Sequence, residues 1–131
     1  MKLNPDCVRA TMLAIESFSF GEECRMNELM GKPEVSGYSE DDVQYTCRKL
    51  LEAGYIKART IRPLRSPELV TSISDLTYAG HEFLNTIRAE KNWAKVKSTA
   101  KAAGVFSLKG LHEIGLQVAA AAITSALQQI L

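Results

Sequence analysis

Four basic side chains lie within nine residues that contain no acidic residue: Lys57, Arg59, Arg62 and Arg65. Each can donate hydrogen bonds to phosphate oxygens, so the cluster suits a nucleic-acid backbone. Arg62 and Arg65 flank Pro63, where we expect a turn, and arginines in this position suit a minor groove or a phosphate. The alternative is a solvated hairpin, on which basic side chains protect an open sheet edge. The residues leave both interpretations open.

A second group of side chains with recognition chemistry comes shortly before this cluster. It comprises Gln44, Tyr45, Arg48 and Lys49, and these types read base edges or hold phosphates, Arg for guanine and Gln for adenine in particular. However, residues 40–42 are Glu-Asp-Asp, and carboxylates repel phosphates. Because a recognition helix approaches the major groove most closely by its N-terminal residues, this helix either docks by its middle and C-terminal half or does not read DNA.

No group in the chain has the spacing of a catalytic or metal site. The candidate metal ligands are Cys7, Cys24, Cys47, His81 and His112. No two of them have the close spacing of structural zinc sites. The pair His81-Glu82 lacks the second His of H-E-x-x-H, and the chain has neither a glycine-rich phosphate loop nor G-x-S-x-G. We therefore expect no enzyme, no bound metal and no cofactor.

The composition is that of an ordinary folded domain. With 131 residues, of which 46% are hydrophobic and 24% charged, the chain is neither collagen-like nor wholly disordered. Three cysteines without C-x-x-C spacing, and an N-terminus without an apolar signal core, predict a reduced, cytoplasmic protein. Residues 114–131 are uncharged, but five polar side chains interrupt them, so we expect no membrane helix and no membrane partner.

The net charge of +1 conceals an asymmetry along the chain. Residues 1–54 hold six basic and ten acidic side chains, a net charge of −4, whereas residues 55–131 hold ten basic and five acidic ones, a net charge of +5. The near-neutral total gives no electrostatic reason to expect a nucleic-acid binder. The basic cluster, however, opens the basic part of the chain.

Capping residues mark two helices before the basic cluster. The first begins at residues 4–6, where Asn, Pro and Asp are each typical of a helix start. The second begins at Ser39 and is closed by Gly54, and Cys47 lies on its core face. Between these helices, residues 27–30 are either a short helical turn or part of an extended stretch.

Two strands and two further helices complete the expected order. The strands, at residues 55–61 and 69–73, form a hairpin whose turn carries two of the arginines. Thr77 caps a helix that we expect to continue, with a bend, as far as Gly104. Ser107 caps the last helix.

Helix, short segment, capped helix, strand, turn, strand and helix is the order of a winged helix-turn-helix domain. We therefore expect a mainly α-helical fold with a small β-hairpin, in the α+β class. Residues 1–90 would form the winged-helix-like domain, and residues 91–131 would add C-terminal helices to the same structural unit. In such a domain the helix that Ser39 begins takes the recognition position, and the hairpin tip reaches the phosphate backbone.

A family resemblance extends from residue 2 to about residue 111. It is carried by the strings Leu50-Leu51-x-Ala53-Gly54-Tyr55-Ile56 and Leu76-Thr77-Tyr78-x-Gly80-His81-Glu82-Phe83-Leu84. These strings resemble a family of small bacterial and prophage-borne proteins known only as a domain of unknown function, whose members are similar to winged-helix regulators. The resemblance implies a winged-helix fold and no particular activity. The chain departs from the family at Thr46, where His is common.

The last helix is the element best suited to self-association. An apolar strip along it consists of Leu111, Ile114, Val118, Ala122 and Leu127. Such a strip either packs on the first helix or pairs with a second copy of the chain. We expect a homodimer.

Two functions follow from these patterns. The leading one is a winged-helix protein that binds double-stranded DNA as a transcriptional or prophage-associated regulator, through the basic cluster and the group at residues 44–49. The other is a non-enzymatic protein-interaction module that keeps the winged-helix scaffold without binding DNA.

Overall fold

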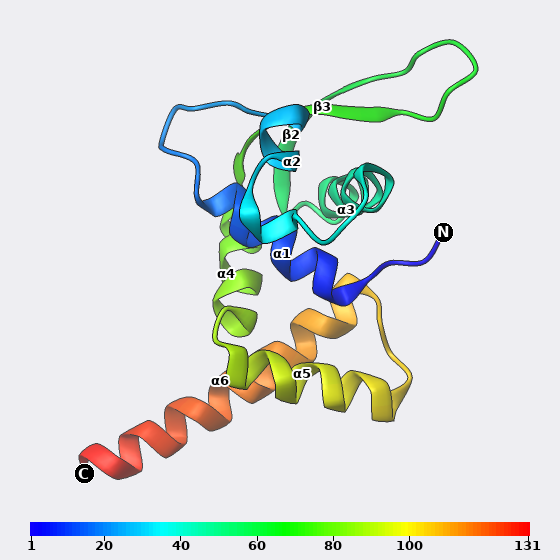
Figure 1. The fold of residues 1–131 in the computed structure, drawn as a ribbon. Helices are drawn as coiled ribbons and strands as arrows, with labels where there is room; N and C mark the ends of the chain where they lie inside the picture. Colours follow the sequence, from blue (N-terminus) through cyan, green and yellow to red (C-terminus); the bar gives the residue numbers. More distant parts are fainter. The chain divides into compact units, whose positions relative to one another are not determined.

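The computed structural model describes all 131 residues, which fold mainly as helices with one small sheet (Figure 1). The elements are α1 (Pro5–Glu16), β1 (Cys24–Arg25), α2 (Met26–Met30), the 3-10 helix η1 (Pro33–Val35), α3 (Glu40–Glu52), β2 (Ile56–Ile61), β3 (Leu69–Leu76), α4 (Tyr78–Ile87), α5 (Glu90–Ala103) and α6 (Leu108–Ile130). The mainly α-helical α+β class predicted from the sequence is confirmed. The chain divides into two compact units, unit 1 (Met1–His81) and unit 2 (Glu82–Leu131).

The sheet of unit 1 has three antiparallel strands in the order β1-β3-β2. β2 and β3 form the expected hairpin. β1 adds a third strand, with Cys24 opposite Ile73 and Arg25 opposite Ser72. Two residues are too few to show a strand periodicity, so this strand was not predicted. The segment that follows it is the short helix α2, one of the two alternatives that the sequence left open.

α3 begins and ends at the residues that its sequence indicates. Ser39 Oγ accepts the N–H of Asp42 at 3.1 Å. At the other end Gly54 has a φ of +79°, and the N–H of Tyr55 donates to the carbonyl of Leu50 at 2.9 Å. This closure requires a left-handed backbone, which glycine adopts without steric cost. It fixes the point at which the chain leaves α3 and enters β2.

Residues 78–103 form two separate helices, so the expected single helix with a bend is wrong. α4 ends at Ile87 and α5 begins at Glu90, with Ala89 in an extended conformation between them. Arginine and alanine, which occupy the break, are good helix formers, so local propensity gives no sign of it. The break allows α5 to bury Trp93 and Val96.

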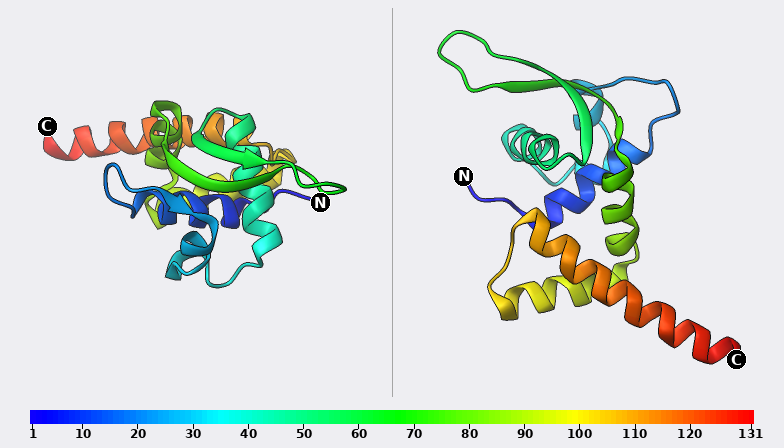
Figure 2. Two further views of the ribbon diagram at one scale, coloured as in Figure 1. Left: turned by 90° about the horizontal axis from the view of Figure 1, so that it is seen from above. Right: turned by 180° about the vertical axis from the view of Figure 1, so that it is seen from behind.

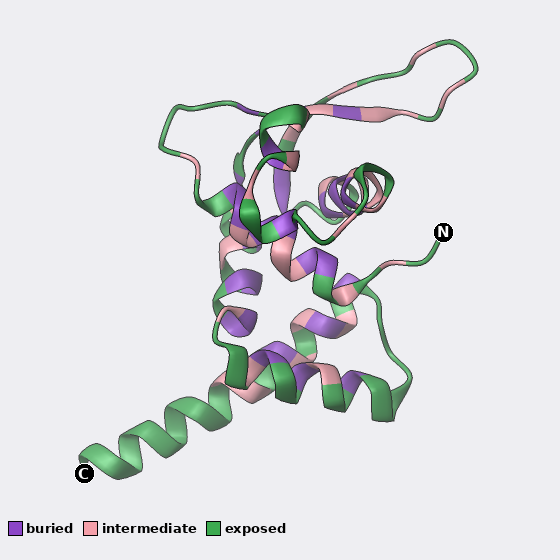
Figure 3. Cartoon of the chain, in the orientation of Figure 1, coloured by how far each residue is buried: buried purple, intermediate pink, exposed green.

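Each unit contains its own set of buried apolar side chains (Figure 3). In unit 1 the fully buried residues include Val8, Met12, Leu29, Val43, Cys47, Leu50, Val70 and Ile73. In unit 2 they include Phe83, Leu84, Ile87, Val96 and Leu111. Cys47 therefore lies in the core, as its helical spacing predicts.

The three cysteines are buried free thiols. Burial, reinforced by the Glu28 carboxylate, raises the pKa of Cys24 from 9.0 to about 12. Burial also raises the pKa of Cys47. Both thiols consequently remain protonated and unreactive while the unit is folded. No helix in the chain is both long enough and apolar enough to cross a membrane.

Candidate nucleic-acid interface

The tip of the hairpin formed by β2 and β3 projects from the rest of unit 1 (Figures 1 and 2). The basic cluster lies on this hairpin, from the start of β2 to the turn. The side chains of Lys57, Arg59, Arg62 and Arg65 are all exposed. Along β2, exposed positions alternate with buried or half-buried ones, and Lys57 and Arg59 fall on exposed positions. Unit 1 therefore brings the four predicted cations together on one hairpin.

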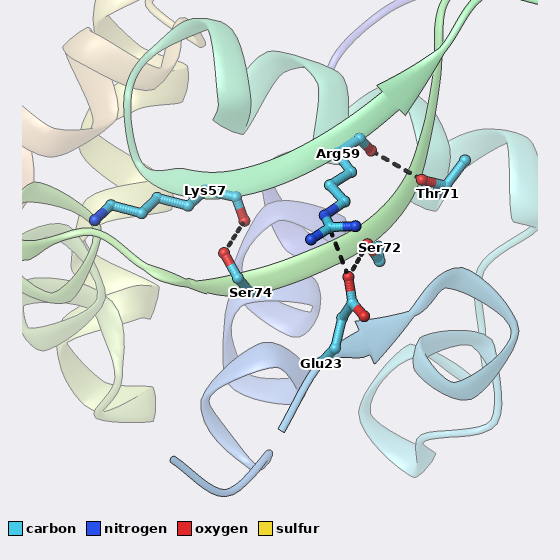
Figure 4. Close-up of polar contacts among 6 residues, drawn as sticks. All are labelled: Glu23, Lys57, Arg59, Thr71, Ser72 and Ser74. Carbon is cyan, nitrogen blue, oxygen red and sulfur yellow. Dashed lines mark hydrogen bonds and ion pairs between the residues drawn. The ribbon is translucent and has the colours of Figure 1, made fainter. Parts of the chain in front are cut away.

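Two register shifts interrupt the pairing of the hairpin, one after Lys57 and one after Arg59. At each shift a hydroxyl of β3 donates to a carbonyl of β2. Thr71 Oγ1 donates to the Arg59 carbonyl and Ser74 Oγ to the Lys57 carbonyl, both at 3.2 Å (Figure 4). Bulges of this kind increase the local twist of a hairpin. The basic tip is consequently rotated relative to the buried base of the same strands.

An acidic side chain from outside the hairpin offsets part of its charge. Glu23 precedes β1, and its Oε1 lies 3.7 Å from Arg59 Nε and accepts a hydrogen bond from Ser72 Oγ at 2.6 Å (Figure 4). The side chain of Lys57 extends away from this pair (Figure 4). The ion pair is largely exposed and contributes at most about 1 kcal/mol to stability. Its main effect is to lower the positive charge around Arg59.

The turn at the tip of the hairpin displays an apolar side chain between two arginines. The N–H of Ser66 donates to the Pro63 carbonyl at 3.1 Å, and Arg65 has a φ of +59°, which is uncommon outside glycine. Leu64, between Arg62 and Arg65 in sequence, is 93% exposed. Apolar wedges beside arginines are used by proteins that enter the minor groove. The two arginines were predicted from the sequence, but the exposed leucine was not.

The side chain of Gln44 is bonded to β3, which counts against its predicted role in reading bases. Its Nε2 donates to the Val70 carbonyl at 3.0 Å, and its Oε1 accepts the Val70 N–H at 2.6 Å. β1 ends at Arg25, opposite Ser72, so the amide takes the place that a longer β1 would occupy beside Val70. Gln44 is thus a clamp between α3 and β3, and its amide is engaged with Val70.

The remaining recognition residues of α3 lie on a surface of mixed charge. Tyr45 and Arg48 are half-buried and line a shallow hollow of about 260 Å³. Asp41, from the first turn of α3, and Glu68, just before β3, line the same hollow. A phosphate that approached Arg48 here would also meet these two carboxylates. The hollow is therefore a poor site for a nucleic-acid backbone.

Charge beyond the hollow follows the same pattern. Lys49 Nζ lies 3.1 Å from Glu52 Oε2 and 5.4 Å from the centre of the Tyr45 ring. Unit 1 holds ten basic and twelve acidic side chains, a net charge of −2, and unit 2 holds six basic and three acidic ones, a net charge of +3. The cations at the hairpin tip thus stand out on a unit that is acidic as a whole.

The predicted dimer strip on α6 does not form one surface. Leu111 is fully buried in unit 2, so it packs within the protomer and is not an interface residue. Ile114 and Val118 are half-buried and line a hollow of about 210 Å³ beside α5. Ala122 and Leu127 are exposed. The spacing of apolar residues does not reveal which face of α6 the rest of unit 2 covers.

Comparison with known proteins identifies a family. Residues 2–106 match the family described as "Hypothetical protein (DUF2513)". A protein of Haemophilus influenzae described as "Uncharacterized protein" is 32% identical to this chain over 115 residues, which are 87% of this chain and 92% of that protein. No solved structure matches the chain.

Proposed function

The chain belongs to the DUF2513 family, and we propose that it is a winged-helix protein that binds double-stranded DNA through the β2–β3 hairpin. The topology of unit 1 supports this proposal, because α1, β1, α2, α3, β2 and β3 follow one another as in a winged helix-turn-helix domain. In that arrangement α3 takes the recognition position and the hairpin is the wing. The wider role that we propose is that of a transcriptional or prophage-associated regulator.

The observation that carries the proposal is the composition of the exposed hairpin tip. Arg62 and Arg65 flank an exposed leucine at the end of an element that projects from unit 1. Lys57 is a further exposed cation at the base of the hairpin, where it lies opposite Asp75. Each contact between one of these cations and a phosphate makes binding more salt-dependent.

We propose that binding has modest sequence specificity. Base-specific recognition needs side chains that reach base edges, and Gln44, which has suitable chemistry, is engaged with Val70. Arg48 lies among carboxylates. Contacts made by the hairpin to phosphates and the minor groove carry little sequence information beyond the shape of the groove.

The test is a titration of fluorescent duplex DNA, of both random and native upstream sequence, followed by anisotropy between about 50 and 200 mM salt. The variant Arg62→Ala/Arg65→Ala removes two cations from the tip. The control Lys91→Ala/Lys95→Ala removes two exposed cations from α5 and changes the net charge equally. We expect the tip variant to reduce the slope of log K against log salt by about 2, since each phosphate contact contributes about 0.9.

Two results would overturn the proposal. One is the absence of binding by the wild type at about 50 mM salt, where electrostatic association is strongest. The other is an equal loss of affinity in the tip variant and the α5 control, which would make binding a property of net charge and not of the hairpin.

A second candidate function is supported by the hollow between α3 and β3. Its mixed lining of Arg48, Asp41, Glu68 and Tyr45 suits a peptide that carries both charges better than a uniformly negative backbone. If DNA binding fails, we propose that unit 1 uses this hollow as a protein-interaction module. In either case we propose a cytoplasmic location, which is supported by three buried, unpaired thiols.

A further inference from the structure

The C-terminal half of α6 extends beyond α5 and is exposed along its whole length (Figure 3). Large apolar side chains of α6 are nevertheless exposed, Leu116 by 49% in the middle of the helix and Ile123 by 61% and Ile130 by 80% in its C-terminal half. These three residues are spaced by seven. Ala119 and Ala126, also exposed or half-buried, are spaced by seven as well. Together they form a heptad stripe with a large residue at one core position and alanine at the other.

We propose that this heptad stripe, residues 116, 119, 123, 126 and 130, is the surface through which two copies of the chain associate. A mean spacing of 3.5 residues keeps a seam turned toward a second helix. Residues 114–131 carry no charge, so two identical surfaces meet without the repulsion that charged side chains would impose on a symmetric pair. The stripe lies on a different face from the strip predicted by spacing alone.

The alternation of large and small residues indicates an antiparallel pair. In an antiparallel pair the two kinds of core position face each other, so Leu116 lies opposite Ala126 of the partner subunit and Ile123 opposite the partner's Ala119. The four layers made by residues 116, 119, 123 and 126 then each hold one large and one small side chain, and the alanines let the helices approach closely. Ile130 lies beyond the last of these layers. In a parallel pair isoleucine would meet isoleucine and alanine would meet alanine, which leaves voids at the alanine layers.

A groove along the stripe provides room for the partner helix. It has a volume of about 530 Å³, and four stripe residues, Leu116, Ala119, Ile123 and Ala126, form part of its α6 wall. The opposite wall comes from α4 and α5 of the same unit and is mostly polar, with Glu82, Asn85, Thr86 and Asn92. An apolar centre with a polar rim is the usual anatomy of an interface.

The groove would add contact area to that of the paired helices. Residues 116–130 span about 22 Å at 1.5 Å per residue, a short seam for two helices on their own. A stable interface buries about 800 Å² on each partner. In a symmetric pair, α6 of each copy lies in the groove of the other copy. Both walls of both grooves then contribute contact area. This inference does not depend on DNA binding.

The first test is sedimentation velocity over a range of protein concentrations. We expect a species of twice 14.4 kDa that dissociates on dilution. Ile123→Glu would bury an unpaired charge in the seam and should weaken self-association by at least about a hundredfold. The control Ser125→Glu places the same charge on the opposite, exposed side of α6. This control should leave self-association unchanged. Either of two results would overturn the proposal. One is a wild type that is monomeric at about 50 µM, whether or not it binds lipid vesicles. The other is equal self-association of the two variants.

The second test reads the direction of the pair by disulfide formation. Leu116 and Ala126 are separated by about 15 Å along one helix, whereas a disulfide needs Cα atoms within about 7 Å. A mixture of Leu116→Cys and Ala126→Cys proteins should form the mixed disulfide on mild oxidation, and neither protein should form one alone. The native cysteines are buried and do not interfere. A disulfide between two copies of the same variant, without the mixed disulfide, would refute the antiparallel arrangement.

Discussion

Replacing Gln44 by methionine removes both bonds of the α3–β3 clamp while keeping the length of the side chain. In the wild type the Val70 N–H lies 2.6 Å from Gln44 Oε1 and the Val70 carbonyl lies 3.0 Å from Gln44 Nε2. Both groups lose these partners in the variant. Each bond contributes about 1 kcal/mol net, and a buried backbone group left without a partner costs more. Val70 is buried, but Gln44 is half-exposed, so water relieves part of that cost. We therefore expect the free energy of unfolding of unit 1 to fall by about 2 kcal/mol.

Urea unfolding measures this change for each unit separately. All four tyrosines, at positions 38, 45, 55 and 78, lie in unit 1, and the one tryptophan, Trp93, lies in unit 2. With a urea dependence of about 2 kcal/mol per M, the midpoint of the tyrosine signal should fall by about 1 M. Hydrogen exchange at the Val70 amide should become faster. The control Gln128→Met, at an exposed position of α6, should stay within about 0.5 kcal/mol of the wild type.

In the variant Gln44→Glu, the stability contributed by the clamp should depend on pH. A protonated carboxyl donates to the Val70 carbonyl and accepts the Val70 N–H, as the amide does, whereas a carboxylate repels that carbonyl. The pKa of the introduced carboxyl in the folded state therefore lies above the unfolded value of about 4.3. Its contribution to stability is complete below about pH 4.3 and is lost as the pH rises through the folded pKa. Equal deficits relative to wild type at pH 4 and pH 7, or a Val70 amide as protected in Gln44→Met as in wild type, would refute the clamp.

Three further predictions concern single side chains. A Cβ at Gly80 would overlap the carbonyl oxygen of Tyr55, so Gly80→Ala should lower the unfolding free energy of unit 1 by more than about 3 kcal/mol, and an unchanged melting temperature of the tyrosine signal would contradict this. The pKa of Cys24 is raised from 9.0 to about 12 by burial, so its contribution to stability is complete below pH 9 and is lost as the pH rises toward 12; the urea midpoint should fall over this range, and less steeply in Cys24→Ala. Glu23→Gln removes the carboxylate beside Arg59 and should tighten DNA binding up to about fivefold at low salt, and unchanged affinity would place Arg59 outside the contact.

Local signals explain which parts of unit 1 were predictable from sequence. The cap at Ser39 and the left-handed Gly54 act on their immediate neighbours, so the limits of α3 could be derived from residue types alone. The clamp made by Gln44 joins residues 26 positions apart. The pairing of Glu23 with Arg59 depends on the strand β1, which is only two residues long. Neither contact has a periodicity or spacing that a sequence pattern could reveal.

The last helix illustrates the same limit in another form. The spacing of Leu116, Ile123 and Ile130 by seven is present in the sequence, yet the strip predicted there included Leu111. Which of several apolar rows on α6 is exposed depends on how α4 and α5 cover its first turns. Apolar rows identify a helix that packs against something, and burial decides which row packs inside the chain.

The clamp at Gln44 also bears on how the chain can change. Because Gln44 ties α3 directly to β3 and the apolar face of α3 is buried in the same core, the position of α3 does not depend on the preceding connection alone. The turn at residues 36–38 can then gain or lose residues among relatives without displacing α3. Gly37, which has open space around it, is accordingly a natural place for insertions during evolution or for a peptide tag introduced by an experimenter.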